Sequence, residues 1–266
     1  MAGIEGSIMD FRQLDLLAAG DSAIHRLDPR IKVLVTLAFI IAVVSFDRYA
    51  LGALIPFALF PVFMLAVANL PLRFIVGKVL LVSLFAIAIG IFNPLLDRQV
   101  LVSIGDIGIS GGWISFASIL LRSVLTVSAA LLLAATTGFP AICRALGRLG
   151  MPQVFVQQLQ FMYRYMFVLA EEAQRMVRAR ELRSCRNRGM GIGPLSSMVG
   201  HLLLRTWERA ERVHMAMLCR GFSGEAVARP AAGLRRADLL FLLGWIALFL
   251  LLRLYNIPRL VGGFFI

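Results

Sequence analysis

Two arginines, Arg180 and Arg220, each stand where a long, mostly apolar stripe of a predicted helix ends. The stripe residues recur at alternating steps of four and three, the spacing of one helix face, and the next step reaches the arginine. The first series is Phe155, Leu159, Met162, Met166, Leu169, Ala173 and Met176, and the second is Val199, Leu203, Thr206, Ala210, Val213 and Met217. A guanidinium binds a carboxylate through two hydrogen bonds and also donates to carbonyls at a helix end. The pattern predicts two amphipathic helices that present arginines to a partner.

The acidic residues on these helices bear on what that partner is. Five glutamates dilute the positive field, and they are Glu171, Glu172, Glu181, Glu208 and Glu211. Mixed charge is typical of a helix surface that is bound by protein. The alternative is a pair of helices lying on anionic lipid headgroups, with the arginines in solvent. Both helices are predicted to end at glycine turns, the first within residues 188–191 and the second at Gly221.

The sequence has no recognisable motif for catalysis, metal binding or nucleotide binding. The cysteines and histidines are too widely spaced for a CxxC, HxxxH or HExxH pattern, and they are Cys143, Cys185, Cys219, His25, His201 and His214. No GxxxxGK[ST] loop occurs, and the glycine-rich residues 189–193 follow no predicted strand, which indicates a linker. We therefore expect a chain that is not an enzyme, binds no metal or cofactor, and does not hydrolyse ATP itself.

The composition indicates a membrane protein. Hydrophobic residues make up 59% of the chain and form long uncharged runs, which excludes a soluble globule. The 27 basic and 15 acidic residues give a net charge of +12. In a soluble protein this charge would suggest nucleic-acid binding, but in a membrane protein it sets orientation and binds partners on the cytoplasmic side. We expect a multi-pass protein of the cell inner (plasma) membrane that contacts the lipid bilayer and no nucleic acid.

An all-α architecture with about five membrane spans follows from the apolar runs. The predicted spans are residues 30–47, 49–72, 79–96, 113–139 and 238–253. Asp28 is placed as the N-cap of the first span, and Pro29 takes its first helical position. Pro56 and Pro61 predict a kink in the second span. The alternation of apolar residues over 100–104 predicts a short hairpin.

Charge also predicts the orientation and the domain organisation. Residues 140–236 carry 16 basic and six acidic residues, a net charge of +10, and are predicted to be cytoplasmic. The chain then divides into residues 1–139, 140–236 and 237–266. Its N-terminal segment lacks the apolar region of a signal peptide, so we expect the N-terminus to be cytosolic. A sixth span over 153–170 or 195–204 is the alternative topology.

Arg30, Lys32 and Arg122 are three of the cations within the predicted spans. Arg30 and Lys32 are expected to snorkel from the end of the first span toward water. Arg122 is the single charge within residues 107–143. A functional or pairing role is the default for such a residue, and a snorkelling or interhelical hydrogen-bonded arginine is an equal alternative.

The chain resembles the transmembrane T subunit of energy-coupling-factor transporters, specifically the cobalt-type CbiQ family. The resemblance rests on His25-Arg26-Leu27-Asp28-Pro29-Arg30-Ile31-Lys32, Met151-Pro152, Tyr163-Arg164-Tyr165, Glu171-Glu172, Ala179-Arg180 and Ala216-Met217-Leu218-Cys219-Arg220-Gly221-Phe222. These marks occur in one order and extend over nearly the whole chain. The first and last blocks are the more specific ones.

The resemblance implies a docking role for the two arginine motifs. In the family, two Ala-Arg-Gly triplets insert into grooves on a pair of ABC-type ATPase subunits. Here the triplets read Ala179-Arg180-Glu181 and Cys219-Arg220-Gly221, so both arginines are kept while the flanking residues differ. The ATPase-docking residues implied are Ala179, Arg180, Cys219, Arg220 and Gly221. Arg183 or Arg188 could share the role of the first motif.

The resemblance also implies a function. The chain would be a non-catalytic scaffold that couples ATP use by its partner ATPases to a membrane-embedded substrate-binding (S) subunit of the cobalt type. Cobalt ion is the cargo implied, with nickel or a vitamin as alternatives. A self-sufficient secondary transporter or channel would need ionisable residues in several spans. A membrane-bound enzyme would need acidic residues or histidines clustered near one face.

Overall fold

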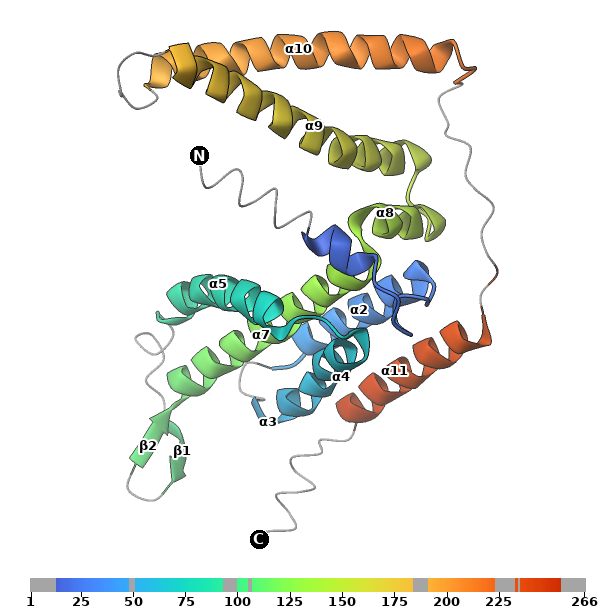
Figure 1. Ribbon diagram of the computed structural model, residues 1–266. Coiled ribbons are helices and arrows are strands. Elements are labelled where there is room, and N and C mark those ends of the chain that lie inside the picture. The colour runs from blue at the N-terminus through green and yellow to red at the C-terminus, as the bar shows by residue number, and fades with distance from the viewer. Residues whose placement is uncertain are drawn as a thin grey trace. The chain divides into compact units, whose positions relative to one another are not determined.

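The computed structural model describes residues 13–47, 51–92, 100–104, 107–183, 191–222, 233 and 235–254 (Figure 1). The chain forms two compact units. The apolar unit comprises Leu14–Ile142 and Gly233–Ile266, and the arginine-rich unit comprises Met1–Gln13 and Cys143–Ala232. The division into 1–139, 140–236 and 237–266 stays a prediction.

The described part of the apolar unit is helical apart from one hairpin, which confirms the predicted all-α class. Its elements are α2 (Pro29–Val44), α3 (Leu51–Leu54), the 3-10 helix η1 (Ile55–Ala58), α4 (Leu59–Ala68), α5 (Leu72–Gly90), β1 (Val100–Ile104), β2 (Ile107–Ser110), α7 (Gly111–Thr137) and α11 (Arg236–Leu254). The antiparallel pairing of β1 with β2 is the predicted hairpin.

An aromatic cluster forms the centre of the apolar unit. Phe39 of α2 lies 4.7 Å from Phe60 of α4 and 5.5 Å from Phe249 of α11, measured between ring centroids. Trp245 of α11 meets Phe60 edge to face at 4.9 Å. Aromatic pairs at these separations contribute about 0.5–1.5 kcal/mol each beyond the area they bury. The cluster therefore joins α2, α4 and α11 into one packed body.

Four helical segments of the described residues are long and apolar enough to cross a membrane. They are Leu51–Ala68, which combines α3, η1 and α4, together with α5, α7 and α11. Helix α2 has 16 residues and would span about 24 Å at 1.5 Å per residue, somewhat less than a hydrocarbon core of ~30 Å. With α2 the count is the predicted five. Helices that contain residues 153–170 and 195–204 are not among the four.

The second and third predicted spans differ from the observed helices at their junction. The kink expected at Pro56 is confirmed as the 3-10 helix η1, but the helix ends at Ala68. Asn69 has a φ of 51°, a left-handed conformation that terminates a helix, and Pro71 then precedes α5. Arg73 and Lys78 consequently lie inside α5 and not between two spans.

The start of α2 confirms one prediction and corrects another. The side chain of Asp28 accepts from the amide of Arg30 at 2.9 Å, and Pro29 occupies the first turn, as the capping pattern predicts. Lys32, however, does not snorkel to water. It is 2% exposed, and its Nζ donates to the carbonyl oxygen of Thr136 at 2.9 Å. The last carbonyls of α7 lack partners within their own helix, so this acceptor holds the ammonium inside the unit.

Two arginines hold the other end of α2. Arg122 of α7 donates to the carbonyl oxygen of Asp47. Of the alternatives predicted for Arg122, the structure shows the hydrogen-bonded arginine. Arg253 of α11 donates to the carbonyl oxygen of Ser45 at 3.0 Å, and its guanidinium lies 4.3 Å from the ring centroid of Phe46. Residues from α7 and α11 thus fix the chain where α2 ends.

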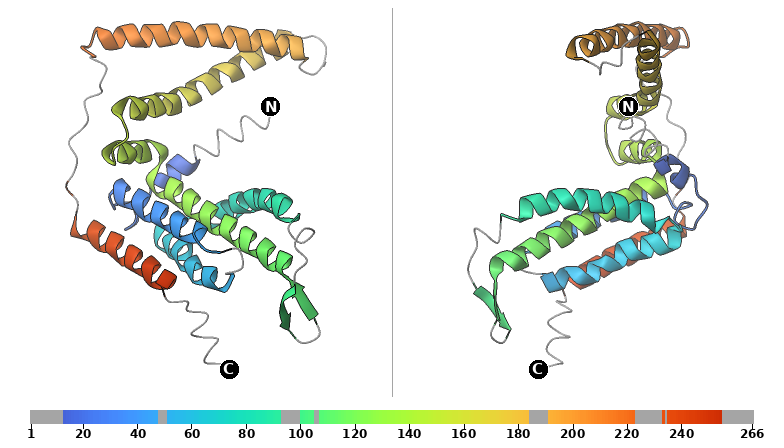
Figure 2. Two further views of the ribbon diagram at one scale, coloured as in Figure 1. Left: turned by 180° about the vertical axis from the view of Figure 1, so that it is seen from behind. Right: turned by 60° about the vertical axis from the view of Figure 1, so that its left-hand side comes forward.

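The arginine-rich unit is built from two long helices. Helix α8 (Phe139–Arg148) crosses the boundary between the units and leads to α9 (Gln153–Arg183), which is followed by α10 (Ile192–Leu218). The end of α9 and the start of α10 lie together, and the helices diverge from there (Figure 2). Val156 is buried in α9, whereas α10 buries no residue at all. Most of the apolar surface of this pair is therefore exposed.

Candidate functional site

The second arginine motif lies in a defined turn at the end of α10. The amide of Phe222 donates to the carbonyl oxygen of Met217 at 3.1 Å, and the amide of Gly221 donates to that of Leu218 at 2.9 Å. This pair of bonds is a Schellman motif, and it requires a left-handed residue, here Gly221 with a φ of 78°. The predicted glycine cap is confirmed. Cys219 and Arg220 are both exposed on this rigid turn.

The first motif is presented differently, because it lies within a helix. Ala179, Arg180 and Glu181 all belong to α9, which continues to Arg183. Ala179 is exposed and Arg180 is half-buried. The Nη1 atom of Arg180 lies 4.0 Å from the sulfur of Met198 in α10, so the first turns of α10 cover part of this side chain.

Arg183 and Arg188 were predicted as alternatives that could share the role of Arg180, and the structure describes only Arg183. Arg183 is the last residue of α9 and is exposed, so the structure leaves it available beside Arg180. Arg188 lies outside the described residues, as does most of the glycine turn predicted over 188–191. The sequence-based docking assignments themselves stay predictions.

The structure places the two motif arginines at opposite ends of the helix pair. Arg180 contacts α10 near its start, at Met198, whereas Arg220 follows its last turn. The 22 residues from Met198 to Arg220 correspond to about 33 Å of helix at 1.5 Å per residue. Two guanidinium groups so far apart cannot bind one small ligand together. Each is suited to a separate contact on a large partner, or on two partners.

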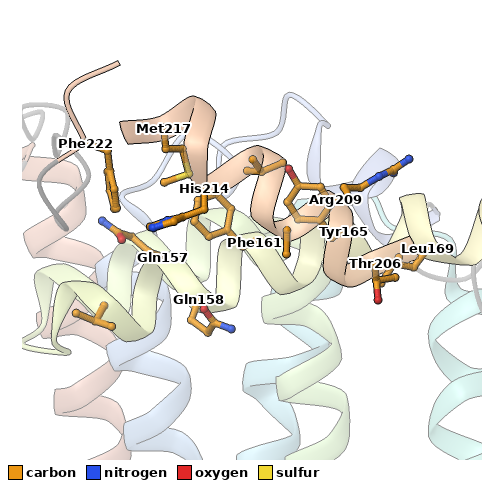
Figure 3. Close-up of a pocket in the computed structure, with 13 residues that line it drawn as sticks. Gln157, Gln158, Phe161, Tyr165, Leu169, Thr206, Arg209, His214, Met217 and Phe222 are labelled. Carbon is orange, nitrogen blue, oxygen red and sulfur yellow. The ribbon is translucent and has the colours of Figure 1, made fainter. Parts of the chain in front are cut away.

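An ion pair and an open cavity define how α9 and α10 meet. Arg205 of α10 pairs with the carboxylate of Glu172 in α9, and Arg175 lies 4.0 Å from the same carboxylate. Between the first half of α9 and the second half of α10 lies a cavity of about 450 Å³. Side chains from both helices, including Phe161 and His214, point into it (Figure 3). The ion pair therefore joins the two helices near their middle, and the cavity separates the first half of α9 from the second half of α10.

Some residues of the two predicted apolar stripes line the cavity, and others do not. The α10 stripe is confirmed over its second half, where the lining residues are Thr206, Ala210, Val213 and Met217. Of the α9 stripe, Leu169 lines the cavity, while Phe155 and Met162 are 62% and 56% exposed. The aromatic side chains of α9 that line the cavity toward α10 are Phe161 and Tyr165. The other five residues of the stripe that ends at Arg180 are half-buried.

The cysteines differ sharply in their surroundings. Cys219, beside Arg220, is exposed, whereas Cys143 in α8 is 1% exposed. Burial raises the pKa of the Cys143 thiol, because an apolar environment disfavours the thiolate. Cys185 lies outside the described residues. Within the described ranges, no three His, Cys, Asp or Glu residues group as metal ligands would.

Comparisons with known proteins give matches over most of the chain. The CbiQ family, described as Cobalt transport protein, matches residues 20–232. An energy-coupling factor transporter transmembrane protein EcfT of Streptococcus thermophilus is 28% identical over 225 residues, which cover 77% of this chain and 83% of that relative.

Two further relatives match over shorter stretches. An uncharacterized protein of Methanocaldococcus jannaschii is 35% identical over 100 residues, so the match spans 37% of each chain. A putative fused cobalt transport protein CbiMQ of Methanocorpusculum labreanum is 28% identical over 113 residues, 41% of this chain and 18% of the relative. Because the family match extends over most of its length, the chain belongs to the CbiQ family of cobalt transport proteins.

Proposed function

We propose that this chain is the coupling subunit of an energy-coupling-factor importer for cobalt ions. Its arginine-rich unit docks two cytosolic ABC-type ATPase subunits, and its apolar unit carries a membrane-embedded substrate-binding subunit. ATP is bound and hydrolysed by the ATPases, and the cobalt ion is bound as substrate by the other membrane subunit. The arginine-rich unit and the N-terminus lie on the cytosolic side of the plasma membrane.

The exposure of α10 is the observation that carries this proposal. None of its 27 residues is buried by the described chain. Leu203, Leu204 and Trp207 are 65%, 63% and 67% exposed. Helices in proteins owe most of their stability to tertiary packing of an apolar face, and large exposed apolar patches mark binding sites. A partner that covers this helix therefore accounts for its sequence better than solvent does.

The two arginines suit a partner that is present in two copies. Arg180 contacts α10 at Met198, and Met198 and Arg220 lie about 33 Å apart along the helix. Each arginine can therefore enter a groove on a different subunit. In such a groove a guanidinium can bind a carboxylate or the carbonyls at a helix end through paired hydrogen bonds. The Glu172 to Arg205 ion pair links the two helices between these points. Movement of either ATPase would then displace α9 and α10 together.

Energy coupling follows from this arrangement. Closure and opening of the ATPases during the nucleotide cycle are rigid-body movements, and long helices transmit them without bending much. The displacement of α9 and α10 passes into the apolar unit and reorients the substrate subunit, which releases its ion inward. The cargo rests on the family's description as cobalt transport proteins and on the name of the fused relative.

Co-purification with the ATPase subunits, together with an assay of ATP hydrolysis, tests this proposal. The tagged chain, expressed with the ATPase subunits encoded beside such a transporter, should retain them through purification in detergent. The purified chain alone should hydrolyse no ATP above background, and hydrolysis should appear with the ATPases present. A chain that transports cobalt without any ATPase would be a secondary transporter, and one that hydrolyses ATP by itself would be an enzyme. Either result would overturn the proposal.

A further inference from the structure

A single buried carboxylate joins the first turns of two helices in the apolar unit. Asp238 is 2% exposed and lies in the first turn of α11. Its Oδ2 accepts from the amide of Arg235 at 2.9 Å, which closes the start of α11 in the manner of a capping box. Its Oδ1 accepts from the amide of Asp28, the N-cap of α2, at 3.0 Å. The positive ends of both helix dipoles therefore converge on one negative charge.

A buried cation completes this polar node, which we define as Asp28, Lys32, Thr136, Arg235 and Asp238. Lys32 is also 2% exposed, and its ammonium is attracted by the carboxylates of Asp28 and Asp238. Its Nζ donates to the carbonyl of Thr136, one of the terminal carbonyls that α7 cannot satisfy itself. The negative end of the α7 dipole thus meets a positive charge. Three helix ends, two carboxylates and one ammonium meet at this node.

The place of this node in the chain suggests a role beyond stability. Thr136 lies seven residues before Cys143, where the chain enters the arginine-rich unit. Asp238 lies six residues after Ala232, where the chain leaves that unit. Both covalent connections between the units are therefore fastened, within a few residues, to the same short segment at the start of α2.

We propose that Lys32 and Asp238 are positioning residues of the transport cycle. They hold both connections of the arginine-rich unit to the start of α2, so that a displacement of that unit moves α2, α7 and α11 as one body. This inference rests on the proposed coupling function and adds the point at which movement enters the apolar unit. Neither residue touches the cargo or the ATP.

The chemistry of the node explains why it would transmit movement and not absorb it. Separating the helix ends would leave a buried ammonium or carboxylate without its partner, which is far more costly than separating apolar side chains. The helix ends therefore stay together, or move together, during any displacement smaller than local unfolding. A neutral, weakly bonded node would let α7 and α11 shift against α2 and dissipate the movement.

Two near-isosteric variants test the inference in the complete complex. Asp238→Asn keeps the size of the side chain but removes its charge and replaces one of the two accepting oxygens with a donor. Lys32→Met keeps an unbranched side chain that is one atom shorter, and it removes the donor and the charge. The wild type and each variant are reconstituted with the ATPases and the substrate subunit in proteoliposomes. ATP hydrolysis and cobalt uptake are then measured in the same sample.

The expected result is loss of coupling with assembly intact. The ATPases should still co-purify and hydrolyse ATP, while cobalt taken up per ATP should fall by about tenfold, within the usual range of coupling between distant sites. Lys32→Arg, which restores a buried cation and a donor, should recover much of the ratio. The matched control is Asp21→Asn, which breaks the exposed ion pair with Arg26, 2.8 Å long, in the same unit. It should leave the ratio unchanged.

The outcomes separate this inference from the proposed function. If the wild-type complex shows no ATP-dependent uptake, the proposed function fails. If the wild type couples and both variants transport with the wild-type ratio, the positioning role is refuted while the function stands. If every variant at Lys32 and Asp238, including Lys32→Arg, fails to insert into the membrane, the node serves folding alone and the inference is likewise overturned.

Discussion

The amide of Asp28 donates to a carboxylate oxygen of Asp238, which lies 210 residues later in the chain, at 3.0 Å. This bond joins the start of α2 to the start of α11. At the other end of the same two helices, Arg253 donates to the carbonyl of Ser45 at 3.0 Å. Helices α2 and α11 therefore run parallel, side by side. Both must enter the membrane from the same face.

This parallel pairing sharpens the expected membrane topology. If the segment before α2 is cytosolic, the segment before α11 is cytosolic too, in agreement with the net charge of +10 over residues 140–236. Reporter fusions near residue 190 should therefore read as cytosolic, and fusions near 103 and 262 as external. A cytosolic signal near residue 103 would contradict the five-span topology.

The motif arginines should contribute most of the affinity for the ATPases. Arg180→Ala or Arg220→Ala is expected to weaken assembly by about 2–5 kcal/mol, because truncation also strands the partner's charge in a buried site. Arg→Lys should rescue only partly, since an ammonium cannot reproduce a planar pair of donors. The measurement is the ATPase-binding constant at matched membrane expression. Arg178→Ala, on another face of the same helix, is the control that should bind normally.

The glycine of the second motif should matter through its backbone. Gly221 has a φ of 78°, so Gly221→Ala is expected to cost about 1–2 kcal/mol in the turn that presents Arg220. Hydrogen exchange at the amides of Gly221 and Phe222 should accelerate, and ATPase binding should weaken. The control is Gly200→Ala within α10, where an added Cβ meets nothing within 4 Å. It should neither accelerate hydrogen exchange in the turn nor weaken ATPase binding. Equal effects at both positions would remove the argument from turn geometry.

Cys219 offers a native reporter of docking. In a Cys185→Ser background, the exposed Cys219 should react rapidly with a maleimide. Cys143 should react slowly at neutral pH and faster as the pH increases, because burial raises its pKa and only the thiolate reacts. Bound ATPases should protect Cys219 and leave the rate at Cys143 unchanged. Unaltered labelling of Cys219 in the assembled complex would mean that the second motif is not at the interface.

The sequence was informative wherever a local pattern determines the structure. The N-cap at Asp28, the kink at Pro56, the hairpin near residues 100–110 and the glycine cap at Gly221 depend on neighbouring residues, and each is confirmed. Long uncharged runs likewise predicted the apolar helices in approximate number and position. The break at Asn69 was missed because the apolar run was assigned as one span, whereas Asn69 followed by Pro71 is a pattern that ends helices.

Contacts between distant segments could not be predicted in the same way. Lys32 looked like a snorkelling residue because the local sequence does not reveal the Thr136 carbonyl, 104 residues away, that accepts its hydrogen bond. The acidic partner of Asp28 lies on the last helix, and one sequence holds no periodicity that relates them. The stripe on α9 was assigned from spacing alone, which does not show that the rings of Phe161 and Tyr165 face α10.

ATP-driven cobalt uptake by the reconstituted complex tests the central claim most directly. Proteoliposomes that hold this chain, the ATPases and the substrate subunit should accumulate cobalt only when ATP is supplied on the side of the ATPases. The Arg180→Ala, Arg220→Ala double variant should insert normally, lose the ATPases and accumulate no cobalt above background. Uptake that persists in the double variant, or that needs no ATP, would contradict the account of this chain as an arginine-docked coupling subunit.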